Sequence, residues 1–280
     1  MQSGKLDLKK IFDDLSSDDY ELQHQASDIL LSQIKDNESF LNELCEFYDE
    51  TKELYYQKRS IIMLKLIVTM RFKLIQRCFK DFNITIKNFI IQPNETIILE
   101  MFADLVYHIS LRLKSGDYPP ESIWEYLMNF LFLYQDHKTV LPFSNYLYSS
   151  LVQDKSFYLE YQQQLKEIAF PIINAGLQND DQALLSCNIF GKIFKNVDDF
   201  DEIMHKNDEN VDIINTIAQN SLLINENNED NFYLFWSHLY KVSTPISNSL
   251  FVIAMSFYPN KNLCPKNRNM LLNFIIRRSD

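Results

Sequence analysis

The chain has 280 residues, of which only 4 are glycine and 8 are proline, while 46% are hydrophobic; its formal net charge is -11 at pH 7. Parallel-sheet folds and phosphate-binding loops need glycines for tight turns and close backbone approach, so this composition disfavours β-rich and nucleotide-binding proteins. The negative charge disfavours binding to a nucleic-acid backbone, since that affinity comes from lysine and arginine. The composition therefore predicts a folded helical chain whose partner is a neutral or basic polypeptide.

Helical periodicity dominates the chain from its N-terminal end. After the opening MQSGKLDLKK, apolar residues recur every three or four positions with charged or amide residues between them, and strand-like alternation is rare. Two examples are residues 121–135, which follow a double proline, and residues 161–177, where Tyr161, Leu165 and Ile172 share one helical stripe. No run approaches the roughly 20 apolar residues that span a bilayer, so we expect no membrane span.

Short polar segments separate these helical stretches. Residues 16–18, 36–38 and 115–117 are examples, and their Ser, Asp and Asn side chains can cap a helix that follows. Because short connections place consecutive helices side by side and antiparallel, the chain is predicted to be all-α and to form a single domain over residues 1–280. Helical hairpins are predicted near residues 5–35, 38–72, 73–114, 119–153, 157–196, 199–242 and 245–278.

These hairpins repeat about every 40 residues, which is the period of HEAT and armadillo units. The predicted architecture is therefore an α-solenoid of about seven HEAT/armadillo-like hairpins. Such a stack leaves an extended surface suited to long, flexible or basic polypeptides, so a protein-binding scaffold is the predicted function.

Residue patterns for catalysis, cofactors and metals are missing from the sequence. It has no GxGxxG, GxxxxGK[ST], GxSxG or HExxH pattern and no CxxC pair. We therefore expect no enzyme, no cofactor and no metal site. His108 lies at the edge of an apolar stripe and is predicted to be a packed histidine of the core or of its rim. The cysteines lie far apart and are predicted to be reduced and buried: Cys45, Cys78, Cys187 and Cys264.

Paired acids and aromatic runs have structural explanations as well. Asp18-Asp19 and Asp180-Asp181 come at expected helix starts, where carboxylates cap free backbone N–H groups and complement the helix dipole. The aromatic run at residues 232–236 lacks the interleaved lysine and arginine of a nucleic-acid platform, so it is predicted to pack inside a hairpin. We expect no nucleic-acid partner.

The first predicted hairpin resembles a known repeat. A polar turn at residues 16–18 is followed by a helix over residues 22–34 that contains Gln25-Ala26. This arrangement resembles the first HEAT repeat of importin-β-type nuclear transport receptors (karyopherin-β), in which a short polar turn precedes a helix with an "xQAe" motif.

The second predicted hairpin adds to this resemblance. Residues 57–67 contain Leu64-Lys65 and are similar to the family's "R..A..xLKN.I" helix. Two positions depart from the family pattern: Ile62 or a neighbour stands where the family has alanine, and Leu66 stands where it has asparagine.

The resemblance implies the N-terminal part of a longer nuclear transport receptor, found in the cytoplasm and the nucleus. Such receptors bind the GTP-bound form of the small GTPase Ran through their first repeats and contact cargo and nucleoporins at other faces. Ran-GTP, basic cargo and nucleoporins are thus the implied partners. The implied packing positions are Gln25, Ala26, Leu64 and Lys65, and candidate contacts with a protein partner are Asp18, Asp19 and Asp28.

The alternative function is a HEAT-repeat structural subunit that organises a multiprotein complex independently of Ran. Such a subunit would keep fixed partners and ignore the nucleotide state of Ran. A helical enzyme, the third class, would need polar side chains converging in a buried pocket, and the sequence gives no sign of one.

Overall fold

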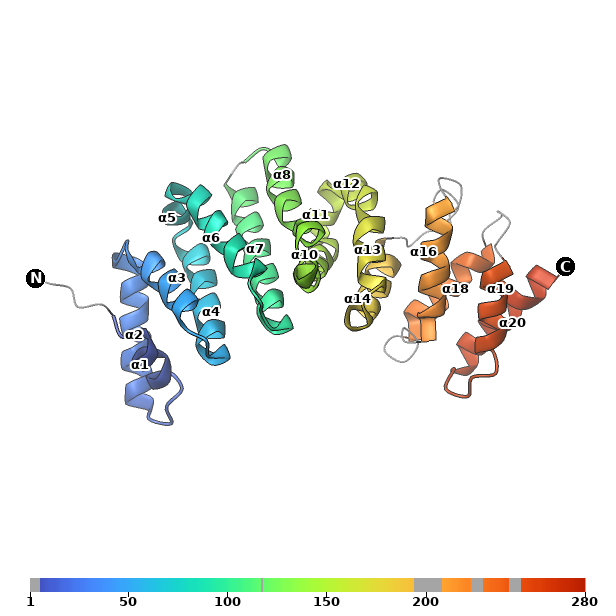
Figure 1. Cartoon of the computed structure of the whole chain (residues 1–280), viewed down its shortest axis with the longest axis horizontal. Helices are drawn as coiled ribbons and strands as arrows, with labels where there is room; N and C mark the ends of the chain where they lie inside the picture. Colours follow the sequence, from blue (N-terminus) through green and yellow to red (C-terminus); the bar gives the residue numbers. More distant parts are fainter. Residues whose placement is uncertain (1–5, 117, 194–207, 223–228, 242–247, 280) are drawn as a thin grey trace, which may run out of the picture. The chain divides into compact units, whose positions relative to one another are not determined.

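The computed structural model describes residues 6–116, 118–193, 208–222, 229–241 and 248–279 (Figure 1). Throughout these ranges the regular structure is helical and no strand occurs, which confirms the predicted all-α class. The chain divides into two compact units, Met1–Leu147 and Tyr148–Asp280. The single domain predicted over the whole chain stays a prediction.

The first unit is a succession of helices that lie side by side in chain order, from blue to green in Figure 1. Helices that follow one another pack together: α1 with α2, α3 with α4, and α6 with α7. The helices are α1 (Leu8–Asp14), α2 (Tyr20–Asp36), α3 (Phe40–Glu50), α4 (Leu54–Met70), α5 (Phe72–Arg77), α6 (Phe79–Ile91), α7 (Thr96–Ser115), α8 (Pro120–Leu131), α9 (Leu133–Asp136), the 3-10 helix η1 (Lys138–Val140) and α10 (Leu141–Gln153), within which the unit boundary falls.

Helix α4 lies at the centre of this packing, because it contacts α1, α2, α3 and α7. Ile61, Leu64 and Ile67 recur at three-residue steps on its buried side, and Leu64 and Ile67 are at most 1% exposed. Tyr48 of α3 adds an aromatic contact to the next helix pair: its ring centroid lies 4.5 Å from that of Phe89 on α6. Apolar side chains therefore bind consecutive helix pairs into one continuous core.

Hydrogen bonds between neighbouring helix pairs of the first unit join residues 37 to 46 apart in the sequence, and several join residues 43 apart. The Tyr55 hydroxyl donates to the backbone oxygen of Phe12 at 2.8 Å, across 43 residues. Gln92 Nε2 donates to Asp49 Oδ1 at 3.2 Å across the same 43 residues. Two more bonds with this separation are donated by the Tyr56 hydroxyl to Asp13 and by Arg112 to the backbone oxygen of Thr69.

The second unit is also built from helices that pack on their neighbours. Helix pairs α13–α14 and α19–α20 are adjacent in sequence, while α14–α18 and α18–α20 join separate segments. Its bridging hydrogen bonds again span similar separations, 38 residues from Asn267 to Glu229 and 39 from Arg278 to Leu239. The helices are α11 (Lys155–Glu160), α12 (Gln162–Glu167), α13 (Ala169–Leu177), α14 (Asp180–Ile193), α16 (Asp208–Gln219), α18 (Glu229–Lys241), α19 (Asn248–Phe257) and α20 (Pro265–Ser279).

The predicted continuous helical stripe at residues 161–177 is interrupted in the structure. Helix α12 ends at Glu167 and α13 begins at Ala169, with Ile168 between them. Pro171 explains the break, since proline has no N–H to donate and its ring would clash with the carbonyl four residues earlier, at Glu167.

Two further predictions, the later hairpins and the absence of a membrane span, can be compared with the described residues only. The end of the hairpin predicted at 157–196, parts of the hairpin predicted at 199–242 and the start of the hairpin predicted at 245–278 lie outside the described residues. Among the helices that the structure does describe, none combines the length and apolar character needed to cross a membrane.

Candidate protein-binding site

The residues of the two family-like motifs differ in how deeply their side chains are buried. Ala26 and Leu64 are 2% and 0% exposed and belong to the core. Lys65 is partly exposed, and Gln25 is exposed, so the Gln25 side chain is not a packing position. Successive residues of an α-helix point about 100° apart, and the buried face of α2 is therefore occupied by Ala26 and not by its neighbour.

Lys65 belongs to a polar cluster on the facing surfaces of α4 and α7. Lys65 Nζ pairs with Asp104 Oδ2, and His108 Nε2 lies 3.4 Å from Asp104 Oδ1. One turn further along, Arg112 donates to the backbone oxygen of Thr69. The His108 side chain is 31% exposed, as expected for a rim position. This surface carries more basic than acidic groups, so it is a poor match for basic cargo.

Burial lowers the pKa of His108, the neighbouring Lys65 ammonium lowers it further, and Asp104 opposes both. Lys65→Met should therefore raise the pKa of His108 and Asp104→Asn should lower it, as measured by NMR titration of the His108 ring. The pKa of His108 in the folded chain lies below the ordinary 6.5. Between these two pKa values the unfolded chain binds more protons than the folded chain, so the free energy of unfolding decreases as the pH falls through this range. Lys65→Met should weaken that loss. Lys58→Met, two helical turns away, is the control and should leave the titration unchanged.

The three candidate aspartates near the N-terminus lie on the surface. Asp19 is the N-cap of α2, where Oδ1 accepts from the backbone N–H of Glu21 at 2.9 Å and of Leu22 at 3.4 Å. Asp28 lies 3.1 Å from His24 Nδ1 on the same helix. Asp18 is exposed. Capping therefore accounts for Asp19, whereas Asp18 and Asp28 are accessible to a partner.

The cap predicts a modest stability effect. Asp19→Ala should lower the free energy of unfolding of the first unit by about 1 kcal/mol, because two backbone N–H groups lose their acceptor. Asp19→Asn should retain most of the stability, since an amide oxygen also caps a helix. Urea unfolding followed by Trp124 emission in a Trp236→Phe background measures the effect. A loss of the same size in the matched variant Asp18→Ala would show that charge, and not the cap, is responsible.

All four cysteines are free thiols, but only Cys187 is buried. Cys45, Cys78 and Cys264 are partly exposed, so the prediction that all four are buried is wrong for these three. Burial raises the pKa of Cys45 and of Cys187 to about 12, which keeps both thiols neutral. Within the described residues, no three His, Cys, Asp or Glu side chains come together as a metal-binding group.

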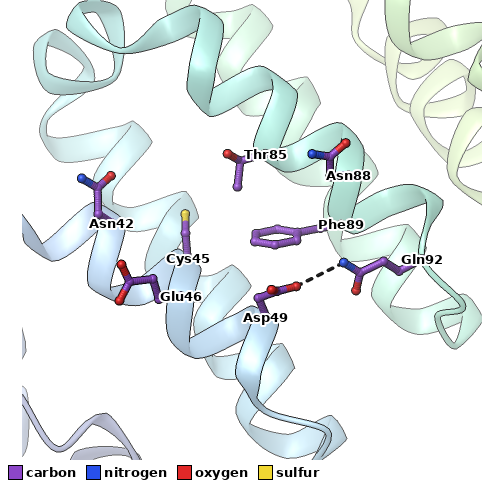
Figure 2. A pocket seen from close by; sticks show the side chains of 8 residues that line it. All are labelled: Asn42, Cys45, Glu46, Asp49, Thr85, Asn88, Phe89 and Gln92. Atoms are coloured by element: carbon purple, nitrogen blue, oxygen red, sulfur yellow. Dashed lines mark hydrogen bonds between the residues drawn. The ribbon is translucent and has the colours of Figure 1, made fainter.

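An open groove lies between α3 and α6, with a volume of about 460 Å³ (Figure 2). Helix α3 contributes four residues at positions i, i+3, i+4 and i+7, which is the spacing of one helical face. Three residues of α6 and the residue that follows it form a second set 43 positions later, the separation of several hydrogen bonds between helix pairs. The lining residues are Asn42, Cys45, Glu46 and Asp49 of α3, Thr85, Asn88 and Phe89 of α6, and Gln92. We call this feature the α3–α6 groove.

The α3–α6 groove combines a small apolar floor with polar walls. Phe89 is 4% exposed and its ring packs against that of Tyr48, whereas Asn42 and Asn88 are exposed. The Asp49–Gln92 hydrogen bond crosses the groove at one end (Figure 2). The lining residues include two carboxylates, Glu46 and Asp49, and no Lys, Arg or His.

The sequence was also compared with known proteins. No protein-family model matches the chain, and no curated protein matches it. The arrangement of the described residues is therefore the basis for a functional proposal.

Proposed function

We propose that the chain is a protein-binding scaffold, built as an α-solenoid of about seven stacked helical hairpins. The observation that supports this proposal is the similar reach of its contacts: hydrogen bonds between helix pairs join residues 37 to 46 apart in the first unit, and several in the second unit join residues 35 to 39 apart. Stacked repeats give this result because each repeat touches only its neighbours. A scaffold of this kind binds other proteins along its surface and carries no catalytic role.

Quantitative co-purification of the tagged full chain tests the scaffold proposal. A scaffold should retain a small set of proteins in fixed molar ratio, and the purified partner should bind the purified chain directly. Loss of every partner on purification, or recovery of the monomeric chain alone at endogenous expression, would contradict the proposal.

The more specific form of the proposal is a nuclear transport receptor that binds Ran-GTP, carries basic cargo, contacts nucleoporins, and is present in the cytoplasm and the nucleus. Its support is the motif resemblance, together with the buried positions of Ala26 and Leu64. Purified chain should bind Ran loaded with a GTP analogue more tightly than Ran loaded with GDP. Equal binding of the two forms would defeat the transport proposal. Asp18→Lys with Asp28→Lys should weaken the interaction if these exposed carboxylates contact Ran.

A structural subunit that works without Ran is the second candidate. Leu66 favours it, because this residue stands where the transport receptors carry asparagine. The Ran experiment separates the candidates: a chain that keeps stoichiometric partners but does not distinguish GTP from GDP forms of Ran is a scaffold of the second kind.

A further inference from the structure

We propose that copies of this chain associate with one another, the first helix pair of one copy docking on the last described helix pair of another. The first pair is α1 with α2, and the last pair is α19 with α20. This inference goes beyond the proposed scaffold function, because it concerns contacts between identical chains and requires no other protein.

Helix α19 has the composition of a buried helix, although one of its sides is exposed. Its ten residues include no Asp, Glu, Lys or Arg. Leu250, Ile253 and Ala254 are buried, and the helix packs on α16 and α20. Val252 and Met255, one turn apart, are 63% and 48% exposed. Because a helix with a solvated side normally carries charged residues there, the uncharged outer side of α19 indicates a contact surface.

The last helix pair is also basic. Residues 248–279 contain five lysine or arginine residues and no acid, in a chain whose net charge is -11. Lys266 pairs with an acid of α18, but Lys261 is exposed. Arg268 donates to backbone oxygens, and the Arg277 guanidinium lies 4.7 Å from the centroid of a tyrosine ring of α18. These partners are uncharged, so both arginines keep their positive charge.

The first helix pair presents the opposite charge beside exposed apolar residues. Residues 7–35 contain seven acids and three lysines. On α2, Leu22 and Ile29 are 38% and 43% exposed. Each follows an exposed acid, Glu21 and Asp28 respectively. Residues seven apart are separated by about two helical turns, so α2 carries an apolar stripe with an acidic stripe beside it.

Charge complementarity selects a second copy of the chain as the occupant. On the last pair, Ile276 is 56% exposed and precedes Arg277, so apolar and basic residues adjoin there as apolar and acidic residues do on α2. Asp28 retains its charge beside His24, which is charged only when protonated. Two first pairs would oppose acid to acid and two last pairs base to base. The favoured contact is therefore between unlike surfaces, each with apolar side chains to bury.

Sedimentation velocity of the full purified chain tests this inference. A contact between two helix pairs is small, so we expect association at about 10 to 100 μM chain. Species longer than a dimer should form, because a contact between unlike surfaces leaves one of each kind open in the dimer. Ile29→Lys on α2 and Val252→Glu on α19 should each weaken association about tenfold or more. Each variant keeps one intact surface, so a mixture of the two should form a one-to-one dimer and no longer species.

Matched controls place the same substitutions at exposed apolar positions elsewhere. Ile84→Lys on α6, at a 48% exposed position, and Leu159→Glu on α11, at a 65% exposed position, should leave sedimentation unchanged. Because all four positions are exposed, thermal unfolding of these variants should match that of the wild type.

The charge contribution is tested by reversal. Glu21→Lys with Asp28→Lys should weaken association, and Lys261→Glu with Arg277→Glu added to the same chain should restore it. Raising the salt concentration from about 50 to about 500 mM should weaken association of the wild-type chain, a measurement that needs no variant.

A chain that stays monomeric at about 300 μM would overturn the inference. Undiminished association of the Ile29→Lys or Val252→Glu variant, or a mixture of the two that forms no dimer, would overturn it as well. Binding of the monomeric chain to anionic lipid vesicles would assign the basic surface to a membrane instead. Partner proteins that still co-purify after such a result would leave the scaffold proposal standing, so the two failures are distinguishable.

Discussion

Leu64→Asp should lower the free energy of unfolding of the first unit by about 4 kcal/mol, enough to unfold a marginal domain. Leu64 is 0% exposed on α4, the helix that contacts α1, α2, α3 and α7. An aspartate there would bring an ionisable group without a partner into the apolar core and would also remove the packing of the leucine.

The experiment can follow each unit separately, because the sequence has two tryptophans, Trp124 in the first unit and Trp236 in the second. Urea unfolding in a Trp236→Phe background reports on the first unit through Trp124. Ile62→Asp is the matched control: it lies two residues away on the same helix, is 40% exposed, and should change stability by about 0.5 kcal/mol. Similar losses for both variants would mean that Leu64 is not the buried residue that the structure shows.

The helices could be predicted from the sequence because each one buries a single stripe of side chains. Leu64 illustrates this, since its apolar neighbours recur at helical spacing and its burial follows from that pattern. The break at Ile168 was missed because the apolar stripe continues across it. The signal was present in Pro171, whose missing N–H ends the preceding helix four residues earlier.

The groove was harder to predict than the helices. Asn42, Glu46 and Asn88 are exposed polar residues, and within the sequence of a single helix they are indistinguishable from other solvated residues. That they line one groove is visible only when α3 and α6 are aligned at a separation of 43 residues, which places the two helical faces opposite each other. Sequence periodicity gives the faces of each helix but not the register between helices, which depends on packing. Gln25 shows a related limit: a motif match does not tell which of two adjacent side chains is buried.

The second unit depends on Trp236 for the packing of α18. This side chain is 0% exposed, its ring centroid lies 5.2 Å from that of Phe274 on α20, and its indole N–H donates to Ser221 Oγ at 3.2 Å. Trp236→Ala should lower the free energy of unfolding of this unit by about 4 kcal/mol, through lost burial and the cavity left behind. Circular dichroism measures the change, and Leu234→Ala, at a 43% exposed position of α18, is the control with little expected effect.

The indole hydrogen bond can be separated from the packing of the ring by a double-mutant cycle. Ser221→Ala alone leaves the buried indole N–H of Trp236 without its acceptor and should cost about 1–3 kcal/mol. In a Trp236→Phe background the N–H is absent, so the same serine substitution should cost clearly less. The difference between the two costs is the coupling energy between the side chains, which is measurable for residues in contact. Equal costs in both backgrounds would show that the serine does not hold the indole, and that ring packing alone fixes α18 against its neighbours.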